Sequence, residues 1–286
     1  MSIVCMALMA ALLVFSRAAT DAARTALDCF GTGVLPALLP MMVLGKVMPK
    51  RTKTERSSKR LWMSSLLFAF AAGSPASAQR AAEITGRFSR RYWESLLCVT
   101  GVMSPMFFTG TLAGWLGSTR DGWVMLGLHW LGAAITAALW TAAVRPQGEY
   151  ASSARPRRAR TGLPDAITQS AQSLLCVCGA MMTFSVAAGL LKSVSGAVFP
   201  GWTARHAGAL AVLWGVMEIG GGSHAVIGAL EAPHAALSAL CGFGGLSVWL
   251  QNMLFLEQKI RPVKLLAMRA VHGAVCYALV RILRPF

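Results

Sequence analysis

Apolar runs of roughly 20 residues, each long enough to cross the hydrocarbon core of a bilayer as a helix, recur along almost the whole sequence. Charged residues make up only 13% of the chain, about half the share found in soluble domains. The sequence therefore predicts an all-α polytopic membrane protein embedded in a lipid bilayer, with its first membrane helix at the N-terminus. The runs lie approximately at residues 2–16, 25–48, 61–79, 94–117, 122–144, 166–191, 207–229, 235–256 and 263–283.

The basic residues, which give a formal net charge of +16, lie in the gaps between these runs. Cationic loops beside apolar spans are typical of the cytoplasmic side of a membrane protein, and this pattern argues against nucleic-acid binding. The loops at 46–60 and 155–160 are therefore predicted to be cytoplasmic. The chain divides into an N-terminal membrane half at 1–144, a basic cytoplasmic linker at 145–164 and a C-terminal membrane half at 165–286.

The run at 61–79 has basic residues on both sides, so both of its ends are expected on the same face of the membrane. Gly73-Ser74-Pro75 interrupts this run, and proline breaks or kinks a helix interior. We expect the run to enter the bilayer, break and return as a re-entrant hairpin, which must be shielded by protein or line a cavity. The alternative is a kinked full span with an exceptional charge distribution.

The two halves show weak similarity, because Asp21-Ala22 recurs as Asp165-Ala166, 144 residues later. The counterpart of the break at 73–75 in the second half is Gly220-Gly221-Gly222-Ser223, which predicts a second re-entrant hairpin. One hairpin and three crossings in each half give an odd number of crossings, so the second half is expected to be inserted upside down. Inverted repeats of this kind are common in secondary transporters. The Ala, Leu and Gly composition is an alternative source of part of the similarity.

Polar and helix-breaking residues inside the apolar runs are the candidates for a binding site. A broken helix exposes unpaired N–H groups at the start of its second piece, and these attract an anion together with the helix dipole. Small residues also let membrane helices pack closely, so a purely structural role is the alternative. The predicted substrate-binding residues are Gly73, Ser74, Ser77, Ser104, Glu218, Gly221, Ser223, Gly245, Ser247 and Gln251.

Glu218 is the leading charged candidate, because an ionisable group within the bilayer is costly unless it is paired or solvated. It could exchange a proton during transport or pair with a cation, or it could lie at the membrane interface. His129, His272 and Arg269 are expected to form hydrogen bonds between helices. No catalytic motif is present, so we expect no enzymatic activity, no cofactor and no metal site. Most of the seven cysteines lie in apolar runs, where a disulfide framework is not expected.

The order of these motifs resembles the YlbJ-type sporulation integral membrane proteins, from about residue 21 onward. That family belongs with the nucleoside-recognition or Gate domain membrane proteins and is distantly similar to concentrative nucleoside transporters. The sequence departs from the family at Thr100-Gly101-Val102-Met103, which is poorer in amides than the family pattern. The resemblance rests on Gly73-Ser74-Pro75-Ala76-Ser77-Ala78, Ser104-Pro105-Met106-Phe107, His129, Glu218-Ile219 with Gly221, Gly244-Gly245-Leu246-Ser247 with Gln251, Arg269 and His272.

The resemblance implies a bacterial protein made in the mother cell and placed in the outer forespore membrane, where it moves dipicolinic acid toward the forespore. Dipicolinate is a small aromatic dianion, which suits helix N-termini, Ser hydroxyls and a basic cytoplasmic entrance. The expected function is accordingly a transporter for a small organic anion. A nucleoside-type small-molecule carrier and a non-transporting scaffold for spore envelope assembly remain as alternatives. Homo-oligomers or other sporulation membrane proteins are the expected protein partners.

Overall fold

The computed structural model describes residues 2–48, 55–85, 90–143, 161–256 and 260–286. The helices of the first half are α1 (Ser2–Val14), α2 (Ser16–Cys29), the π-helical segment η1 (Phe30–Val34), α3 (Leu35–Val47), α4 (Glu55–Ala72), α5 (Ala76–Glu83), α6 (Arg90–Val99), the π-helical segment η2 (Phe107–Leu112), α7 (Ala113–Leu116) and α8 (Thr119–Ala143). Those of the second half are α9 (Leu163–Val198), α10 (Pro200–Arg205), α11 (Ala207–Met217), α12 (Ile219–Ala229), α13 (His234–Phe243), α14 (Gly245–Leu256) and α15 (Pro262–Leu283).

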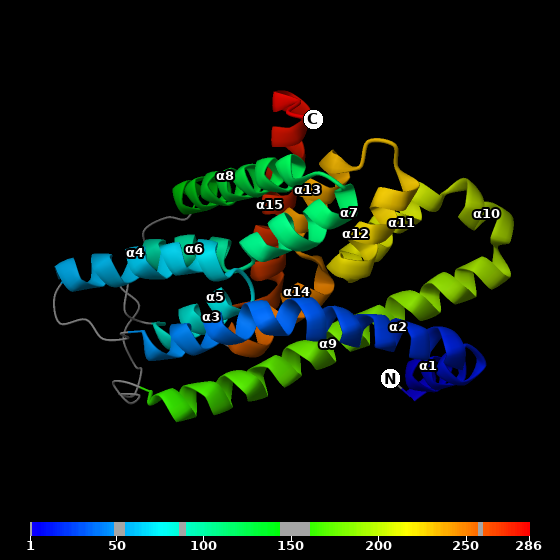
Figure 1. Cartoon of the computed structure of the whole chain (residues 1–286), viewed down its shortest axis with the longest axis horizontal. Helices are drawn as coiled ribbons and strands as arrows, with labels where there is room; N and C mark the ends of the chain where they lie inside the picture. The colour runs from blue at the N-terminus through cyan, green and yellow to red at the C-terminus, as the bar shows by residue number, and fades with distance from the viewer. Residues whose placement is uncertain (1, 49–54, 86–89, 144–160, 257–259) are drawn as a thin grey trace.

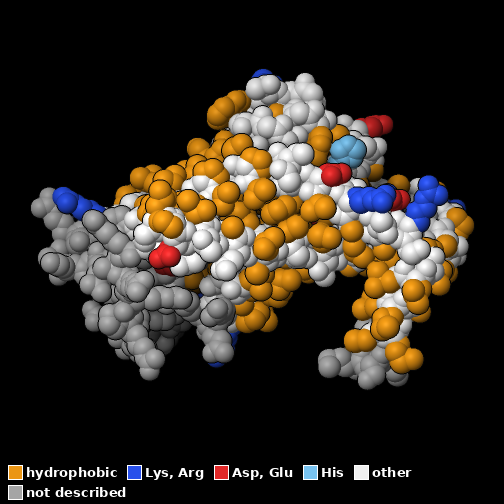
Figure 2. Space-filling view, turned by 60° about the horizontal axis from the view of Figure 1, so that its bottom comes forward, with side chains coloured by type: hydrophobic (Ala, Val, Ile, Leu, Met, Phe, Trp, Pro, Cys, Tyr) orange, Lys and Arg blue, Asp and Glu red, His pale blue; other side chains and the backbone are white. Residues whose placement is uncertain are grey.

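The prediction of an all-α polytopic membrane protein is confirmed. Apolar side chains cover much of the described surface on the face shown in Figure 2, where lipid tails would meet them. Residues 145–160 of the basic linker and residues 49–54 of the loop at 46–60 lie outside the described residues, so the predicted cytoplasmic position of both segments stays a prediction. Among the described residues, five helices are long and apolar enough to cross a membrane, namely Ser16–Val47, Thr119–Ala143, Leu163–Val198, His234–Leu256 and Pro262–Leu283.

Each half contains the same order of elements: a long helix, two interrupted helices and a further long helix. In the first half, α4 and α5 are interrupted at 73–75, and α6 is separated from η2 by a break around 100–104. In the second half, α11 and α12 are interrupted at Glu218, and α13 and α14 at Gly244. In Figure 1, α2 and α3 run along the long helix α9.

Small residues set the distance between neighbouring helices. A Cβ atom added to Gly242 in α13 would lie 2.8 Å from the Cα of Gly273 in α15, and one added to Gly189 in α9 would lie 2.9 Å from the Cβ of Ala22 in α2. Lipid tails are as apolar as the side chains, so the hydrophobic effect contributes little to the association of helices within a bilayer. Close packing at small residues drives that association instead. The glycines at these positions therefore define the packing of the helices that surround the site.

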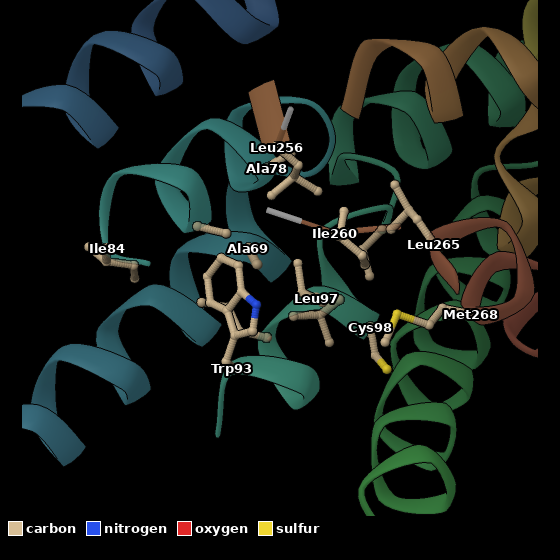
Figure 3. Close-up of a cluster of buried hydrophobic side chains, with 14 of the residues drawn as sticks. Ala69, Ala78, Ile84, Trp93, Leu97, Cys98, Leu256, Ile260, Leu265 and Met268 are labelled. Carbon is tan, nitrogen blue, oxygen red and sulfur yellow. The ribbon is translucent and has the colours of Figure 1, made fainter. Parts of the chain in front are cut away.

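The largest apolar core joins the first half to the end of the second. Trp93 of α6 is 1% exposed and lies beside the α4–α5 hairpin, while Leu97 and Cys98 face Leu265 and Met268 of α15 (Figure 3). The same interface is tied by polar groups, because Lys264 forms an ion pair with the buried carboxylate of Glu94. This core fixes the position of the breaks at 73–75 and 100–104 relative to α15.

Candidate functional site

The helix breaks of both halves surround one central cavity with a volume of about 380 Å³. This volume falls within the range of small-molecule binding sites. We call it the central cavity. Residues of both π-helical segments also line it. Its polar or charged lining residues include Thr32, Ser74, Ser104, Thr111, Glu218, Ser247 and Gln251, and its apolar lining includes Val34, Leu38, Met103, Phe107, Met181 and Val248.

Glu218 forms the tip of a helical hairpin made by α11 and α12. Its two carboxylate oxygens accept hydrogen bonds from the N–H groups of Gly220 at 2.8 Å and Gly221 at 2.7 Å. The carboxylate therefore caps α12 and stabilises the positive end of that helix dipole. Within the described residues it forms no salt bridge with a cation. The N-terminus of α12 is thus already occupied by a side chain of the protein itself.

The break in the second hairpin lies two residues earlier than the start of the glycine cluster that predicted it. Gly220, Gly221 and Gly222 are helical residues of α12, and the chain is extended only at Glu218. An added Cβ at Gly222 would collide with the backbone of Gly215 in α11, so the absence of a side chain allows the two arms to touch. The glycine cluster therefore has two roles. The N–H groups of Gly220 and Gly221 bind the carboxylate of Glu218, and Gly222 allows α12 to pack closely on α11.

The break at 73–75 presses against the second break of the same half. Gly73 has a φ angle of 71°, which favours glycine, and an added Cβ would lie 2.5 Å from the backbone nitrogen of Ser104. Ser74 donates from its backbone N–H to the carbonyl of Val102 at 2.7 Å. Its hydroxyl donates to Oδ1 of Asn252 at 2.7 Å, which joins this break to α14 of the other half.

The start of α14 supplies the opposite wall of the central cavity. Gly244 and Gly245 have φ angles of 85° and 75°, which turn the chain from α13 into α14. The amide of Gln251 donates to the Ser247 hydroxyl at 3.2 Å, and both side chains are buried. The first N–H groups of this 12-residue helix have no partner within the helix. Ser247 therefore lies at a helix end that can bind an electronegative group.

The predicted site residues divide into three groups in the structure. Five of them line the central cavity, namely Ser74, Ser104, Glu218, Ser247 and Gln251. Gly221 lines a smaller neighbouring cavity. The others lie at or beside the breaks and line neither cavity. Gly73 contacts the break at 100–104, and Gly245 approaches Gly215 and Ile219 closely. Ser77 donates a hydrogen bond to the carbonyl of Thr100 at 2.8 Å, and Ser223 is a fully buried residue of α12.

Sequence reasoning missed the two π-helical segments and Asn252. In η1, the N–H of Leu35 bonds the carbonyl of Phe30, one residue further than in an α-helix. Pro36 follows directly, and because it has no N–H it cannot bond the carbonyl of Thr32. Single π-helical turns occur frequently at functional sites. Gly31, Gly33 and Pro36 within an apolar run were the available signal.

The predicted interhelical role of the two histidines is confirmed. The backbone N–H of Met103 donates to Nε2 of His129 at 3.0 Å, and Nε2 of His272 lies 3.1 Å from the carbonyl of His129. Cys276 completes a buried group whose potential ligand atoms lie within 4.8 Å of one another. His129 uses a ring nitrogen to hold the break at 100–104 on α8, and His272 uses one to join α15 to α8. Arg269 donates to the carbonyl of Cys98 and fixes α15 on α6.

Comparisons with protein-family models, with curated proteins and with solved structures find no match to this chain. The fold and the cavity define an all-α polytopic membrane protein with broken helices around a small-molecule-sized central cavity.

Proposed function

We propose that the chain is a non-enzymatic membrane transporter for a small organic solute and that the central cavity is its binding site. The observation that supports this proposal is the convergence of helix breaks from both halves on a single cavity of about 380 Å³. Secondary transporters bind their substrates between discontinuous helices drawn from two repeats. A membrane scaffold has no need for buried serine hydroxyls and a carboxylate around such a cavity, because polar groups within a bilayer are costly.

We propose further that the two halves are inverted repeats, each with one re-entrant hairpin. The common order of elements in the two halves supports this, as does the pairing of a hairpin at 73–75 with a hairpin at Glu218. Three crossings and one hairpin per half would place equivalent hairpins on opposite sides of the membrane. Their tips would then meet near the middle of the bilayer, where Ser74 and Glu218 line the same cavity.

The solute that the family resemblance implies is dipicolinate, moved across the outer forespore membrane during sporulation, and we propose it as the first candidate. The start of α14, Ser247 and Gln251 offer the donors that its carboxylates would need. Glu218 would repel a dianion in its charged form. We therefore propose that Glu218 is neutralised by a proton when the anion binds, which couples transport to protons.

A nucleoside-type uncharged solute is the second candidate, and one specific observation favours it. None of the described residues that line the central cavity is Lys or Arg, and Glu218 is the charged one among them. Hydroxyl, amide and carboxylate groups recognise an uncharged polar solute without a compensating cation. The two candidates therefore differ in whether the protonation of Glu218 is required.

The test is uptake into proteoliposomes that contain the purified chain, with labelled dipicolinate and labelled uridine measured side by side. Ser247→Ala removes a hydroxyl from the cavity, while Ser195→Ala removes a half-buried hydroxyl of α9 that lines neither this cavity nor its smaller neighbour and serves as the control. Saturable dipicolinate uptake that only Ser247→Ala impairs, with abundance unchanged, supports the first candidate. Uptake of uridine alone supports the second. No uptake of either solute by folded protein contradicts transport and favours a scaffold.

A further inference from the structure

We propose that a second cavity, the side cavity, is the other half of the solute path, and that one partition separates it from the central cavity. This inference rests on the proposed transport function. The side cavity has a volume of about 200 Å³ and lies between α2, α9 and the α11–α12 hairpin. Cys29, Met181 and Glu218 line both cavities. These three residues therefore form the partition.

The first turn of α12 faces both cavities at once. Gly220, which donates to Oε1 of Glu218, lines the central cavity, whereas Gly221, which donates to Oε2, lines the side cavity. The two oxygens of a single carboxylate are thus bound to N–H groups on opposite sides of the partition. A solute that crosses the partition must pass this carboxylate.

The hairpin side of the partition is rigid. Gly222 touches the backbone of Gly215, and a Cβ added to Gly245 would lie 3.3 Å from both the carbonyl oxygen of Gly215 and the nitrogen of Ile219. Backbone atoms on three helices therefore meet here without side chains that could change rotamer. Movement of the hairpin tip alone would have to separate these backbones.

The opposite side of the partition has room to move. Cys29 directly precedes η1, and a Cβ added to Gly31 or Gly33 would meet no atom within 4 Å. The π-helical hydrogen bond between Leu35 and Phe30 also closes a turn that contains one residue more than a turn of α-helix. A change of η1 to α-helical pairing would rotate the preceding residue around the helix axis. We therefore assign η1 as the moving element that carries Cys29 away from Glu218.

The side cavity also supplies the cation that the central cavity lacks. Lys192 of α9 lines it together with the hydroxyl-bearing residues Thr25 and Ser185. An ammonium group attracts a carboxylate as a point charge. The side cavity is therefore suited to hold a carboxylate-bearing solute before or after it passes Glu218. Lys192→Gln should raise the KM for dipicolinate several-fold and leave the KM for uridine unchanged, and an equal change for both solutes would contradict this role.

The partition is tested by modifying Cys29 with a water-soluble methanethiosulfonate reagent. We expect the reagent to lower uptake at least tenfold in the native chain and to leave uptake by Cys29→Ser nearly unchanged, although six other cysteines remain. Saturating solute should slow the labelling of Cys29, measured by mass spectrometry. Equal inhibition of both proteins would place the path elsewhere. Absence of uptake by the untreated native chain would instead contradict the transport function.

The moving element is tested without reference to transport. Gly31→Ala combined with Gly33→Ala should stiffen η1 without a steric collision, and Gly179→Ala in α9, which also has no atom within 4 Å, is the matched control. We expect the double variant to slow the labelling of Cys29 several-fold with a melting temperature at or slightly above the native one, and Gly179→Ala to label at the native rate. Equal labelling rates for all three proteins would overturn the assignment of η1.

Discussion

Gly222→Ala should destabilise the α11–α12 hairpin more than any other glycine substitution in α12. The added Cβ would collide with the Cα and nitrogen of Gly215 and would lie 2.8 Å from the carbonyl carbon of Trp214. All three atoms belong to the backbone of α11, so no rotamer change can make room. The two arms must separate by roughly 1.5–2 Å before the nearest contact reaches the usual 3.5–4.0 Å between carbon atoms.

The magnitude follows from two opposing effects. Over-packing of a tight contact costs about 1–3 kcal/mol, and a gap of only about 1 Å between the arms already removes up to half of the dispersion energy along them. Alanine in place of glycine in a helix contributes about 0.5–1 kcal/mol of stability. Gly228 lies in the same helix, and a Cβ added there meets no atom within 4 Å. Gly228→Ala therefore receives the favourable effect without the collision.

The measurement is the melting temperature of each purified variant in the same detergent, followed by tryptophan fluorescence. Because both variants gain the same helix propensity, we expect Gly222→Ala to be less stable than Gly228→Ala by about 1–3 kcal/mol, which corresponds to roughly 2–12 °C. Gly228→Ala should melt at or slightly above the native temperature. Equal melting temperatures for the two variants would refute the backbone contact between α11 and α12, and with it the rigid side of the partition.

Three further predictions concern the supports of the site. Ser77→Ala should lower stability by about 1–3 kcal/mol, because the buried carbonyl of Thr100 loses its hydrogen bond; an unchanged melting temperature would contradict this. Lys264→Met should cost about 1–3 kcal/mol, because the carboxylate of Glu94, 1% exposed, loses its ion pair with Lys264 while the hydrogen bond from Trp140 remains, and adding Glu94→Gln should restore part of that loss in a double-mutant cycle. Gly73→Ala should reduce the yield of folded protein, measured by size-exclusion chromatography, because its positive φ and its contact with the next break both exclude a side chain.

The sequence located the helix interruptions well, because helix breakers act locally. Gly73-Ser74-Pro75 and Gly244-Gly245 coincide with breaks in the structure. The second hairpin was assigned to its glycines, whereas the chain breaks two residues earlier at Glu218, because the carboxylate of Glu218 caps α12 and lets the glycines join that helix. Asn252 was not identified, because its role depends on Ser74, which is distant in sequence.

By itself the sequence determined that this is an all-α polytopic membrane protein with interrupted helices, because the length and polarity of apolar runs are fixed by the thickness of the bilayer. It also determined which polar residues lie within those runs. Only the tertiary structure decided that Ser74, Ser104, Glu218, Ser247 and Gln251 line one cavity. The physical reason is that this convergence depends on backbone contacts between distant glycines, and such contacts leave no periodic pattern in the sequence.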